Sequence, residues 1–577
     1  MLYSLTHQIV KELLKRGVMT RDDVHNVKRA IAGALKLPPP PSADILDAYR
    51  EMVGAQEISV DKKIEELLQV RSVRTLSGVA IITVLTKPYM CPGQCVYCPT
   101  EARMPKSYIA TEPAAARALR LEFDPYEQVA SRLATLERNG HPTDKIELIV
   151  KGGTWSAYRP DYQFWFISRC FAAANDFFGD SSKGDTSKFP LGTLLNAKRL
   201  EVSPLFTFRS VPFRTVPITL RTELREMQSK NETAGHRIIG ITLETRPDWV
   251  HPQTIAILRE LGCTRIELGL QHTDDEILKL VNRGHTLAQF KKAVRLLRAA
   301  GFKVDFHTMP QLPGATPEKD LEMYRTLFAD ADLRPDMIKI YPCVVTRTAE
   351  IYDWWKDGRY VPYADQELIE MLISAKQLVP RYCRISRLIR DIPSTEIYAG
   401  NVVTNLRQVV QKKMRSSGQR CLCLRCREIG HSTDFDNQSA PQFFVEEYES
   451  SGGCEFFLSF EDQERKNVFA FLRLRLPGAL PDADTEKMFE LLPEIRNAAF
   501  IRELHTYGHL VPLDQRLDGA ANAQHRGLGR ALMERAEKIV SDVGGKKIAV
   551  ISGVGVREYY RKLGYAKDGT YMVKRLH

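Results

Sequence analysis

The stretch YMCPGQCVYCPTEARMP, residues 89–105, decides how the rest of the chain is interpreted. It places Cys91, Cys95 and Cys98 close together in a chain of 577 residues that has 11 cysteines. The spacing C-x3-C-x2-C follows directly after the first predicted strand, in a loop with proline and glycine. Three cysteines at this spacing rarely serve only as core residues, so the stretch predicts a metal site.

Two kinds of metal compete for these cysteines. Zinc usually takes four protein ligands in a closed site, whereas three thiolates leave one iron of a 4Fe–4S cluster open for an external ligand. The cluster is the favoured interpretation, and zinc or a structural use is the alternative. The spacing resembles the radical S-adenosylmethionine superfamily, which implies that S-adenosylmethionine binds the open iron and gives a 5′-deoxyadenosyl radical.

Apolar strands alternate with helical patterns between residues 79 and 345. Near-continuous apolar strands separated by helices indicate a parallel sheet covered by helices. With no dinucleotide fingerprint, the pattern predicts an α/β fold, a partial (βα)6 barrel. Residues 178–192 interrupt it and are predicted to be a surface insertion. The six predicted strands are 79–86, 145–154, 237–248, 265–271, 303–314 and 337–345.

The chain divides into four predicted regions. The proline run LPPPPSAD (37–44) breaks a helical N-terminal segment. After about residue 436, short strands that look antiparallel lead to a strand, a glycine-rich turn, a long helix and two final strands, which predicts a smaller α+β domain. The regions are a helical segment 1–75, the barrel 76–395, a basic linker 396–435 and the α+β domain 436–577.

Charge and hydropathy limit which binding partners and which cellular compartment are expected for this protein. The net charge of +11 at pH 7 favours an acidic partner, nucleic acid first, and the alternative is a basic soluble protein. Residues 381–430 concentrate 11 Lys and Arg against three acidic residues. No run of about 18 apolar residues occurs, and residues 1–17 lack the apolar core of a signal peptide. A cytoplasmic protein without a membrane span is expected.

The segment KGGT ends the second predicted strand and contains Gly152, Gly153 and Thr154. Glycines there let the backbone approach a ligand closely. In radical enzymes this place contacts the methionine amine of the cofactor. The alternative is an ordinary turn.

The C-terminal domain carries a second set of candidate residues. Gln524, Gly527 and Gly529 form a glycine-rich turn at the start of a helix, where backbone N–H groups can hold a pyrophosphate. The turn follows the strand ELHT (503–506) and precedes KIAVIS, the order of a GNAT acetyltransferase, whose splayed strands hold acetyl-CoA. Tyr559 and Tyr560 are predicted at the acetyl group, with aromatic packing as the alternative.

A second group of cysteines lies between the two domains. Cys421, Cys423 and Cys426 have the spacing C-x-C-x2-C, which suggests structural zinc, with free thiols as the alternative. His431, Cys383 or water could complete the ligand set.

The motifs together resemble the catalytic subunit of Elongator, from about residue 65 to the C-terminus. The zinc cysteines are similar to those of bacterial and archaeal members, which points to a prokaryotic protein. The gap between the first two cluster cysteines is shorter than in many members. The motifs include RTLSGVA, DKIELIVKGGT, GITLETRPDW, NRGHT, SRLIRDIPS, QHRGLGRALM and ISGVGVREYYRKLGYAKDGTYMVKRL.

The resemblance implies roles for individual residues. Cys91, Cys95 and Cys98 match the cluster ligands, and Lys145 matches a lysine that touches acetyl-CoA from the barrel side. Further acetyl-CoA contacts are implied for Glu503, Leu504, His505, Thr506, Leu528, Gly529, Arg530 and Tyr560.

The resemblance also implies an activity: formation of 5-carboxymethyluridine at the wobble uridine of tRNA, position 34, from acetyl-CoA. The radical would abstract hydrogen from the acetyl methyl group, and the carbon radical would add to carbon 5 of the base. Residues 381–430, with Arg71 and Arg74, would hold the phosphate backbone of the anticodon stem-loop. A homodimer is allowed, and further Elongator-type subunits are not implied.

Two rivals stay open. One is a protein lysine acetyltransferase that keeps the cluster only for structure, and formation of deoxyadenosine distinguishes it. The other is a tRNA-binding scaffold whose two active sites are inactive. The intact cysteine triad and glycine-rich turn argue against this second rival.

Overall fold

The computed structural model describes residues 2–70, 78–177, 216–429, 440–478, 482–507 and 527–576. The predicted insertion at 178–192, together with Arg71, Arg74, His431 and Gln524, lies outside the described residues. None of the described helices is long and apolar enough to cross a membrane.

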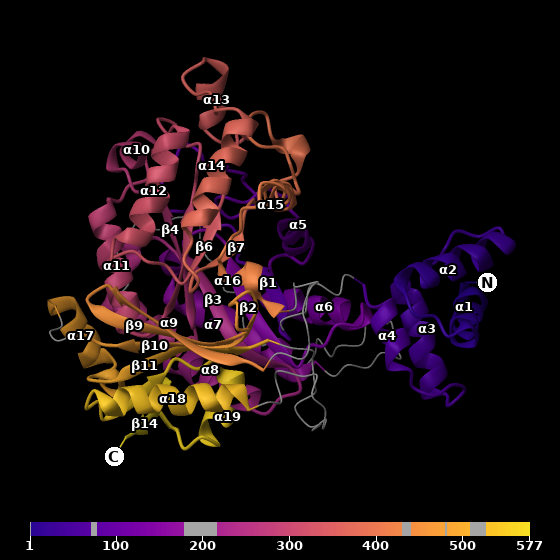
Figure 1. The fold of residues 1–577 in the computed structure, drawn as a ribbon. Helices are drawn as coiled ribbons and strands as arrows, with labels where there is room; N and C mark the ends of the chain where they lie inside the picture. Colours follow the sequence, from indigo (N-terminus) through magenta and orange to yellow (C-terminus); the bar gives the residue numbers. More distant parts are fainter. Residues whose placement is uncertain are drawn as a thin grey trace.

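The N-terminal segment forms a helical bundle beside the barrel (Figure 1). Its core includes Leu13, Tyr49 and Met52, and a capping box at Thr20 begins the second helix. Arg138 of the barrel helix α6 pairs with two aspartates of α3, so charges attach the bundle to the barrel. The bundle consists of α1 (Leu2–Arg16), α2 (Arg21–Ala34), α3 (Ser42–Gly54) and α4 (Lys62–Leu68).

The barrel has seven parallel strands in the order β1 to β7. The six predicted strands are confirmed as β1 (Ala80–Leu85), β2 (Lys145–Lys151), β3 (Arg237–Thr245), β4 (Arg265–Gln271), β5 (Lys303–Thr308) and β6 (Met337–Ile340). The count of six is wrong by one strand, β7 (Arg384–Arg387). With four residues, two of them arginine, β7 has too little apolar pattern to be recognised as a strand. Strands β1 and β7 are the edges of this sheet, so the barrel is partial.

The strands alternate between an outer apolar face and an inner polar one. On β2, Ile146, Leu148 and Val150 are buried in the apolar core, while Lys145 and Lys151 line an interior cavity. The core under the helices therefore fixes the direction of the polar side chains. The helices after the strands are α5 (Pro113–Arg120), α6 (Pro125–Arg138), α7 (Pro160–Asp176), α8 (Ile218–Asn231), α9 (Pro252–Glu260), α10 (Asp275–Leu280), α11 (Leu287–Ala299), α12 (Pro317–Ala329), α13 (Ile351–Lys356), α14 (Asp365–Leu378), α15 (Leu406–Ser416) and α16 (Leu424–Arg427).

The C-terminal part is a mixed sheet in the order β13-β14-β12-β11-β10-β9-β8. The predicted antiparallel pairing of its first strands is confirmed. Strands β11 and β12 are parallel but pair only over residues 499–501 and 548–550, so they part beyond this point. The elements are β8 (Gln442–Ser450), β9 (Gly453–Glu461), β10 (Val468–Leu476), α17 (Ala483–Leu491), β11 (Ala499–Thr506), α18 (Leu528–Asp542), β12 (Lys547–Val550), α19 (Arg557–Arg561), β13 (Ala566–Asp568) and β14 (Tyr571–Arg575).

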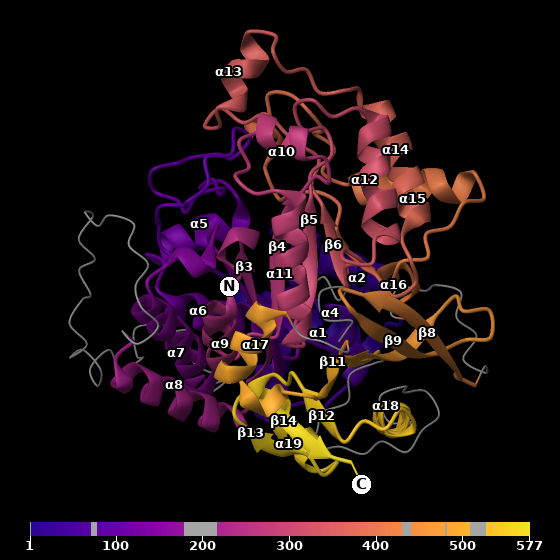
Figure 2. The same ribbon diagram turned by 90° about the vertical axis from the view of Figure 1, so that its left-hand side faces the viewer.

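This second sheet docks against the amino ends of the barrel strands (Figures 1 and 2). A Cβ atom on Gly553 would lie 1.9 Å from the carbonyl oxygen of Ile239 on β3, so only glycine permits this contact. Arg502 donates hydrogen bonds of 2.8 and 2.6 Å to Asp336, the residue before β6, and both are fully buried. Burial alone would raise the pKa of Asp336, but Arg502 holds it well below its ordinary value. The buried pair fixes the two parts to each other.

Candidate active site

One cavity of about 870 Å³ connects the barrel interior with the second sheet. Its wall includes Cys98 of the cysteine loop, Lys145 of β2, and Glu503 and Tyr560 of the C-terminal part. Residues predicted from separate motifs for two different cofactors therefore line the same cavity.

The cysteine loop lies at the carboxyl ends of the strands. The Sγ of Cys91 is 3.5 Å from the Oγ1 of Thr154, which follows β2. The Sγ of Cys95 is 3.7 Å from a guanidinium nitrogen of Arg283. Burial opposes ionisation of Cys95, but Arg283 lowers its pKa below the ordinary value, whereas burial and the neighbouring Cys95 raise the pKa of Cys98 to about 12. The thiolate, which is the form that binds metal, therefore forms more readily at Cys95 than at Cys98.

The loop fits a cluster of several metal ions better than one ion. Among the described residues, the sulfurs of Cys421, Cys423 and Cys426 lie within 4.8 Å of one another, and the sulfurs of this loop do not form such a group. Arg246 adds a second cation: a Cβ on Gly93 would lie 2.3 Å from its Nη1 atom, which is buried with no partner among the described residues. Arg283 at Cys95 and Arg246, which also pairs with Asp248 at 2.9 Å, bring two guanidiniums to the loop, and this setting suits an anionic iron–sulfur cluster, which the superfamily implies.

The motif analysis assigned no role to these two arginines. They belong to the quoted segments GITLETRPDW and NRGHT, which supported only the resemblance. For Arg246, which directly follows β3, the strand-end position was the available signal, because carboxyl ends of parallel strands meet at one edge; Arg283 follows α10, and no such signal marked it.

Backbone geometry requires glycine in the Gly-Gly segment. Gly152 and Gly153 have φ angles of 147° and 86°. A Cβ on Gly152 would lie 1.7 Å from the Oγ1 of Thr86, which forms a 2.7 Å hydrogen bond with Tyr158. The segment therefore passes tightly over β1 beside the cysteine loop. Contact of Gly152, Gly153 and Thr154 with S-adenosylmethionine stays a prediction.

The interior of the barrel holds an ionic network that the sequence analysis missed. Lys339 and His307 contact the buried Glu267 carboxylate at 2.5 and 2.9 Å, and Lys151 bridges Glu267 to Glu244. Burial lowers the pKa of Lys339 to about 8. These residues lie within or at the ends of strands that look simply amphipathic in sequence, so no motif marks them.

At the amino ends of the strands, the segment ELHT of β11 enters the cavity. Glu503 accepts a 2.9 Å hydrogen bond from Arg473 and pairs with Lys303 at 3.4 Å. Although burial opposes it, these two cations lower the pKa of Glu503 to about 2. Glu503 is thus a fixed anion that holds β11 to the barrel.

His505 follows on the same strand, with a different environment. Its ring lies 4.4 Å from the ring centre of Tyr507 and 5.8 Å from that of Phe471. Burial lowers the pKa of His505. Its Nε2 atom is buried and has no hydrogen-bond partner among the described residues. His505 is therefore a neutral imidazole whose Nε2 atom is enclosed by protein, although other atoms of the residue line the cavity.

The glycine-rich turn is partly described. Gly527 has a φ angle of 69° and caps α18. A Cβ on Gly529 would lie 3.0 Å from the Tyr559 hydroxyl and 3.6 Å from Thr506. The structure thus brings the start of α18, the end of β11 and α19 together. Leu528 is buried under the helix, while Arg530 is exposed and pairs with Glu534.

The predicted tyrosine pair separates into two environments. Tyr560 is buried in the apolar core of the second sheet, with its ring edge-on to that of Tyr559, and both line the cavity. Tyr559 is 38% exposed. Either can reach a ligand from the cavity wall, and their role at the acetyl group stays a prediction.

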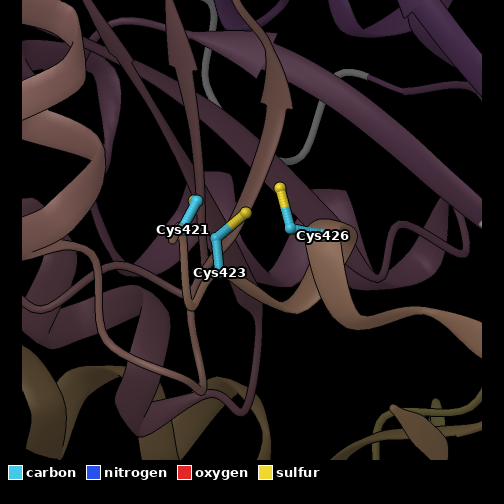
Figure 3. A group of neighbouring side chains, drawn as sticks. All are labelled: Cys421, Cys423 and Cys426. Atoms are coloured by element: carbon cyan, nitrogen blue, oxygen red, sulfur yellow. The ribbon is translucent and has the colours of Figure 1, made fainter. Parts of the chain in front are cut away.

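The second cysteine triad lies beside α16, outside the active-site cavity wall. Figure 3 shows Cys423 and Cys426 pointing toward each other beside Cys421. Among the described residues, Cys383 does not join this group, although its carbonyl accepts a 2.9 Å hydrogen bond from the Leu424 amide. The spacing suits one metal ion, and zinc stays a prediction.

The basic region 381–430 is mostly engaged within the chain. Arg384 pairs with Glu428 at 2.6 Å, and Arg427 pairs with the buried Glu461 at 2.7 Å. Arg390 contacts Glu112 at 3.1 Å. Lys412 and Arg415 of α15 are exposed. The net charge of this region therefore overstates how many of its cations can meet a phosphate.

Known proteins share this arrangement. Residues 216–327 match the model of the radical SAM superfamily, and residues 335–416 match the radical SAM C-terminal domain. The chain is 41% identical over 522 residues to the tRNA uridine(34) acetyltransferase of Methanocaldococcus infernus, covering 88% of each chain. It is 41% identical over 505 residues to that of Dehalococcoides mccartyi, covering 87% of this chain and 99% of the relative.

The likeness extends to eukaryotes and to a solved structure. The chain is 33% identical over 584 residues to human Elongator complex protein 3, covering 98% and 96%. The archaeal Methanocaldococcus infernus Elp3 with an N-terminal deletion matches with a TM-score of 0.68 at 39% identity, covering 87% of this chain and 100% of that one. This chain therefore belongs to the radical SAM family of tRNA uridine(34) acetyltransferases and Elongator complex protein 3.

Proposed function

We propose that this chain modifies the wobble uridine of tRNA, position 34, and forms 5-carboxymethyluridine with carbon from acetyl-CoA. The observation that carries the proposal is the shared cavity, whose wall joins the cysteine loop to the ELHT strand and the start of α18. The names of the relatives supply the tRNA and the uridine.

The radical half of the site uses the first cysteine triad. Cys91, Cys95 and Cys98 would hold a 4Fe–4S cluster, with Arg246 and Arg283 balancing its negative charge. The cluster with S-adenosylmethionine supplies hydrogen-atom abstraction from an unactivated carbon, chemistry that side chains lack. The glycine-rich backbone of Gly152 and Gly153 beside the loop would orient the cofactor's methionine group.

The acyl half is proposed to be a GNAT acetyltransferase domain. Strand β12 leaves β11 after Ile501, and the segment Glu503 to Thr506 beyond this point would pair with the pantetheine arm. The N–H groups at the start of α18 would hold the pyrophosphate. Lys145 would approach from the barrel side, and Tyr560 would hydrogen-bond the thioester sulfur.

The open edge between β1 and β7 is the proposed entry for the base. Arg387 and Arg390 line the cavity there. Specific RNA recognition targets unstacked bases, so a flexed anticodon loop would present its uridine through this edge while α15 meets phosphates. The division into 1–75, 76–395, 396–435 and 436–577, and a second metal at Cys421, Cys423 and Cys426, belong to the same proposal.

The test is anaerobic incubation of the iron-loaded enzyme with tRNA, S-adenosylmethionine and acetyl-CoA, followed by nucleoside mass spectrometry. The expected product is 5-carboxymethyluridine together with 5′-deoxyadenosine. Omission of S-adenosylmethionine is the control. The proposal would be contradicted if this enzyme acetylates protein lysine and forms no deoxyadenosine.

A further inference from the structure

A buried carboxylate joins the barrel to the end of the proposed acetyl-CoA strand. Glu428 is buried at the cavity wall. Its Oε1 atom accepts a 2.6 Å hydrogen bond from Arg384, the first residue of β7, and a 3.2 Å hydrogen bond from the Tyr507 hydroxyl. One oxygen atom therefore contacts both the last barrel strand and the residue that directly follows the ELHT segment.

Tyr507 is well suited to fix the end of that segment. Burial and the neighbouring Glu428 carboxylate raise the pKa of Tyr507 well above its ordinary value, so the hydroxyl keeps its proton and donates it in the hydrogen bond. The Tyr507 amide donates a 2.7 Å hydrogen bond to the carbonyl of Phe469 on β10, and its ring lies 4.4 Å from that of His505. The place of Tyr507 therefore determines the path of the strand end before it.

Glu428 is in turn placed by the second cysteine triad. It directly follows α16, a helix of four residues that begins after Cys423 and contains Cys426. A helix this short is not stable by itself. The sulfurs of Cys423 and Cys426 lie within 4.8 Å of each other and of the Cys421 sulfur. A metal ion shared by these cysteines would close α16 into one fixed turn and so set the direction in which Glu428 leaves it.

The backbone around Glu428 shows the same junction. Glu428 forms a parallel bridge with Val468, the residue before Phe469 and the first of β10. At the other end of α16, the Leu424 amide donates a 2.9 Å hydrogen bond to the carbonyl of Cys383, next to β7. Helix α16 and Glu428 thus connect β7 to β10, and a shift of this segment would move the acyl end of the cavity.

We propose that Glu428 is a positioning residue for the acyl donor, and that the metal at the second triad holds it in place. Through the Tyr507 hydroxyl, Glu428 keeps the end of β11 in the path that the pantetheine arm needs. This inference rests on the proposed function, because it takes acetyl-CoA as the ligand of the ELHT strand. The second metal then controls the affinity for acetyl-CoA without touching it, in addition to stabilising the fold.

The first test removes the hydroxyl. Tyr507→Phe, in the full-length iron-loaded protein, keeps the ring and loses the hydrogen bond to Glu428. The dissociation constant for CoA, which carries the pantetheine arm and has no thioester to hydrolyse, should rise about 10-fold, the low end for a hydrogen bond to a charged group. The affinity for S-adenosylmethionine should not change, because distant sites act independently. Calorimetric titration of each ligand measures both quantities.

Tyr324→Phe is the matched control. It also removes one buried hydroxyl from a hydrogen bond, the 2.9 Å contact with Thr308, and both residues lie outside the cavity wall. CoA affinity should stay at the wild-type value in this variant. If Tyr507→Phe binds CoA as tightly as wild type, or if both variants weaken it equally, the inference is wrong while the proposed function stands. If the wild-type protein binds no CoA, the proposed function itself fails.

The second test asks whether the metal acts through Glu428. Cys421→Ala removes one thiolate and leaves Cys423 and Cys426 in place. It should lose the second metal and weaken CoA binding about as much as Glu428→Ala does. The double variant should bind CoA no more weakly than the weaker single variant, because residues of one linked unit are not additive. Wild-type CoA affinity in metal-free Cys421→Ala, or additive losses in the double variant, would overturn the inference. Iron content and thermal midpoint show whether each variant is folded.

Discussion

The two cysteine triads use the same side chain in the same number and yet prepare different sites. The first lies at the carboxyl ends of the strands, faces two arginines and spreads its sulfurs apart. The second gathers its sulfurs within 4.8 Å of one another and lies near two cations, Arg407 and the fully buried Lys376. The separation of the sulfurs, rather than the number of cysteines or of neighbouring cations, suits one triad to a multi-iron cluster and the other to a single ion.

The largest effect is expected from a substitution that disrupts the first triad alone. Cys95→Ala should remove the 4Fe–4S absorbance and abolish deoxyadenosine formation, because a cluster cannot assemble on the remaining two thiolates. Acetyl-CoA binding and any metal at the second triad should persist. Iron and zinc analysis together with a deoxyadenosine assay test this. Continued cleavage of S-adenosylmethionine would show that the assignment of the first triad is wrong.

The reciprocal change breaks the second triad. Cys423→Ala should lose zinc and keep the iron absorbance, and the loss of a structural metal should lower the free energy of unfolding by more than about 4 kcal/mol. Metal analysis and thermal denaturation of the purified protein measure both quantities. Iron loss in this variant, or an unchanged zinc content, would mean that the two triads are not independent sites.

These two sites also show what the sequence can predict. Both triads, six of the seven barrel strands and the ELHT segment are contiguous patterns, so local spacing reveals them. Strand β7 and the ionic network around Glu267 depend on long-range pairing, because each member comes from a different strand. The neutral state of His505 depends on packing by Phe471 and Tyr507. No local pattern encodes such surroundings.

The basic region gives the same lesson about charge. Its 11 cations are visible in sequence, but the partners of Arg384 and Arg427 lie 44 and 34 residues away. Only the fold reveals that Arg384 pairs beside the barrel with Glu428 and that Arg427 pairs with Glu461 of β9 in the second sheet.

A substitution remote from both triads should change neither the iron nor the zinc content. It therefore tests whether the metal losses expected for the two cysteine variants are specific. Tyr560→Phe keeps the ring in its apolar core and removes the hydroxyl. Loss of one hydrogen bond to an atom that gains charge costs about 2–4 kcal/mol, so CoA release should fall roughly 100-fold. The measurement is CoA release in the presence of tRNA, beside a tRNA gel shift and metal analysis. Release within a few-fold of wild type would make Tyr560 a packing residue and Tyr559 the next candidate.

The smallest expected effect concerns the lysine of the second triad. Lys376 of α14 is fully buried, and its Nζ atom has no hydrogen-bond partner among the described residues. Although burial opposes the charged form, the three cysteines raise the pKa of Lys376 above its ordinary value. Three thiolates around one divalent ion carry a net negative charge, and a buried charge of this kind needs a compensating one.

Lys376→Met should therefore act more strongly on the metal-bound form of the protein than on the metal-free form. In the metal-bound form it removes the compensating cation, so zinc affinity should fall about 10-fold, the low end for residues that support metal ligands. In the metal-free form, hydrogen bonds from Cys421 and Cys426 hold the pKa of Cys423 well below its ordinary value, so Lys376 compensates one thiolate and its replacement should change the thermal midpoint less. Zinc competition titration and thermal denaturation with and without a chelator measure the two effects. A variant that destabilises both forms equally would show that Lys376 serves packing alone and that the second triad needs no nearby cation.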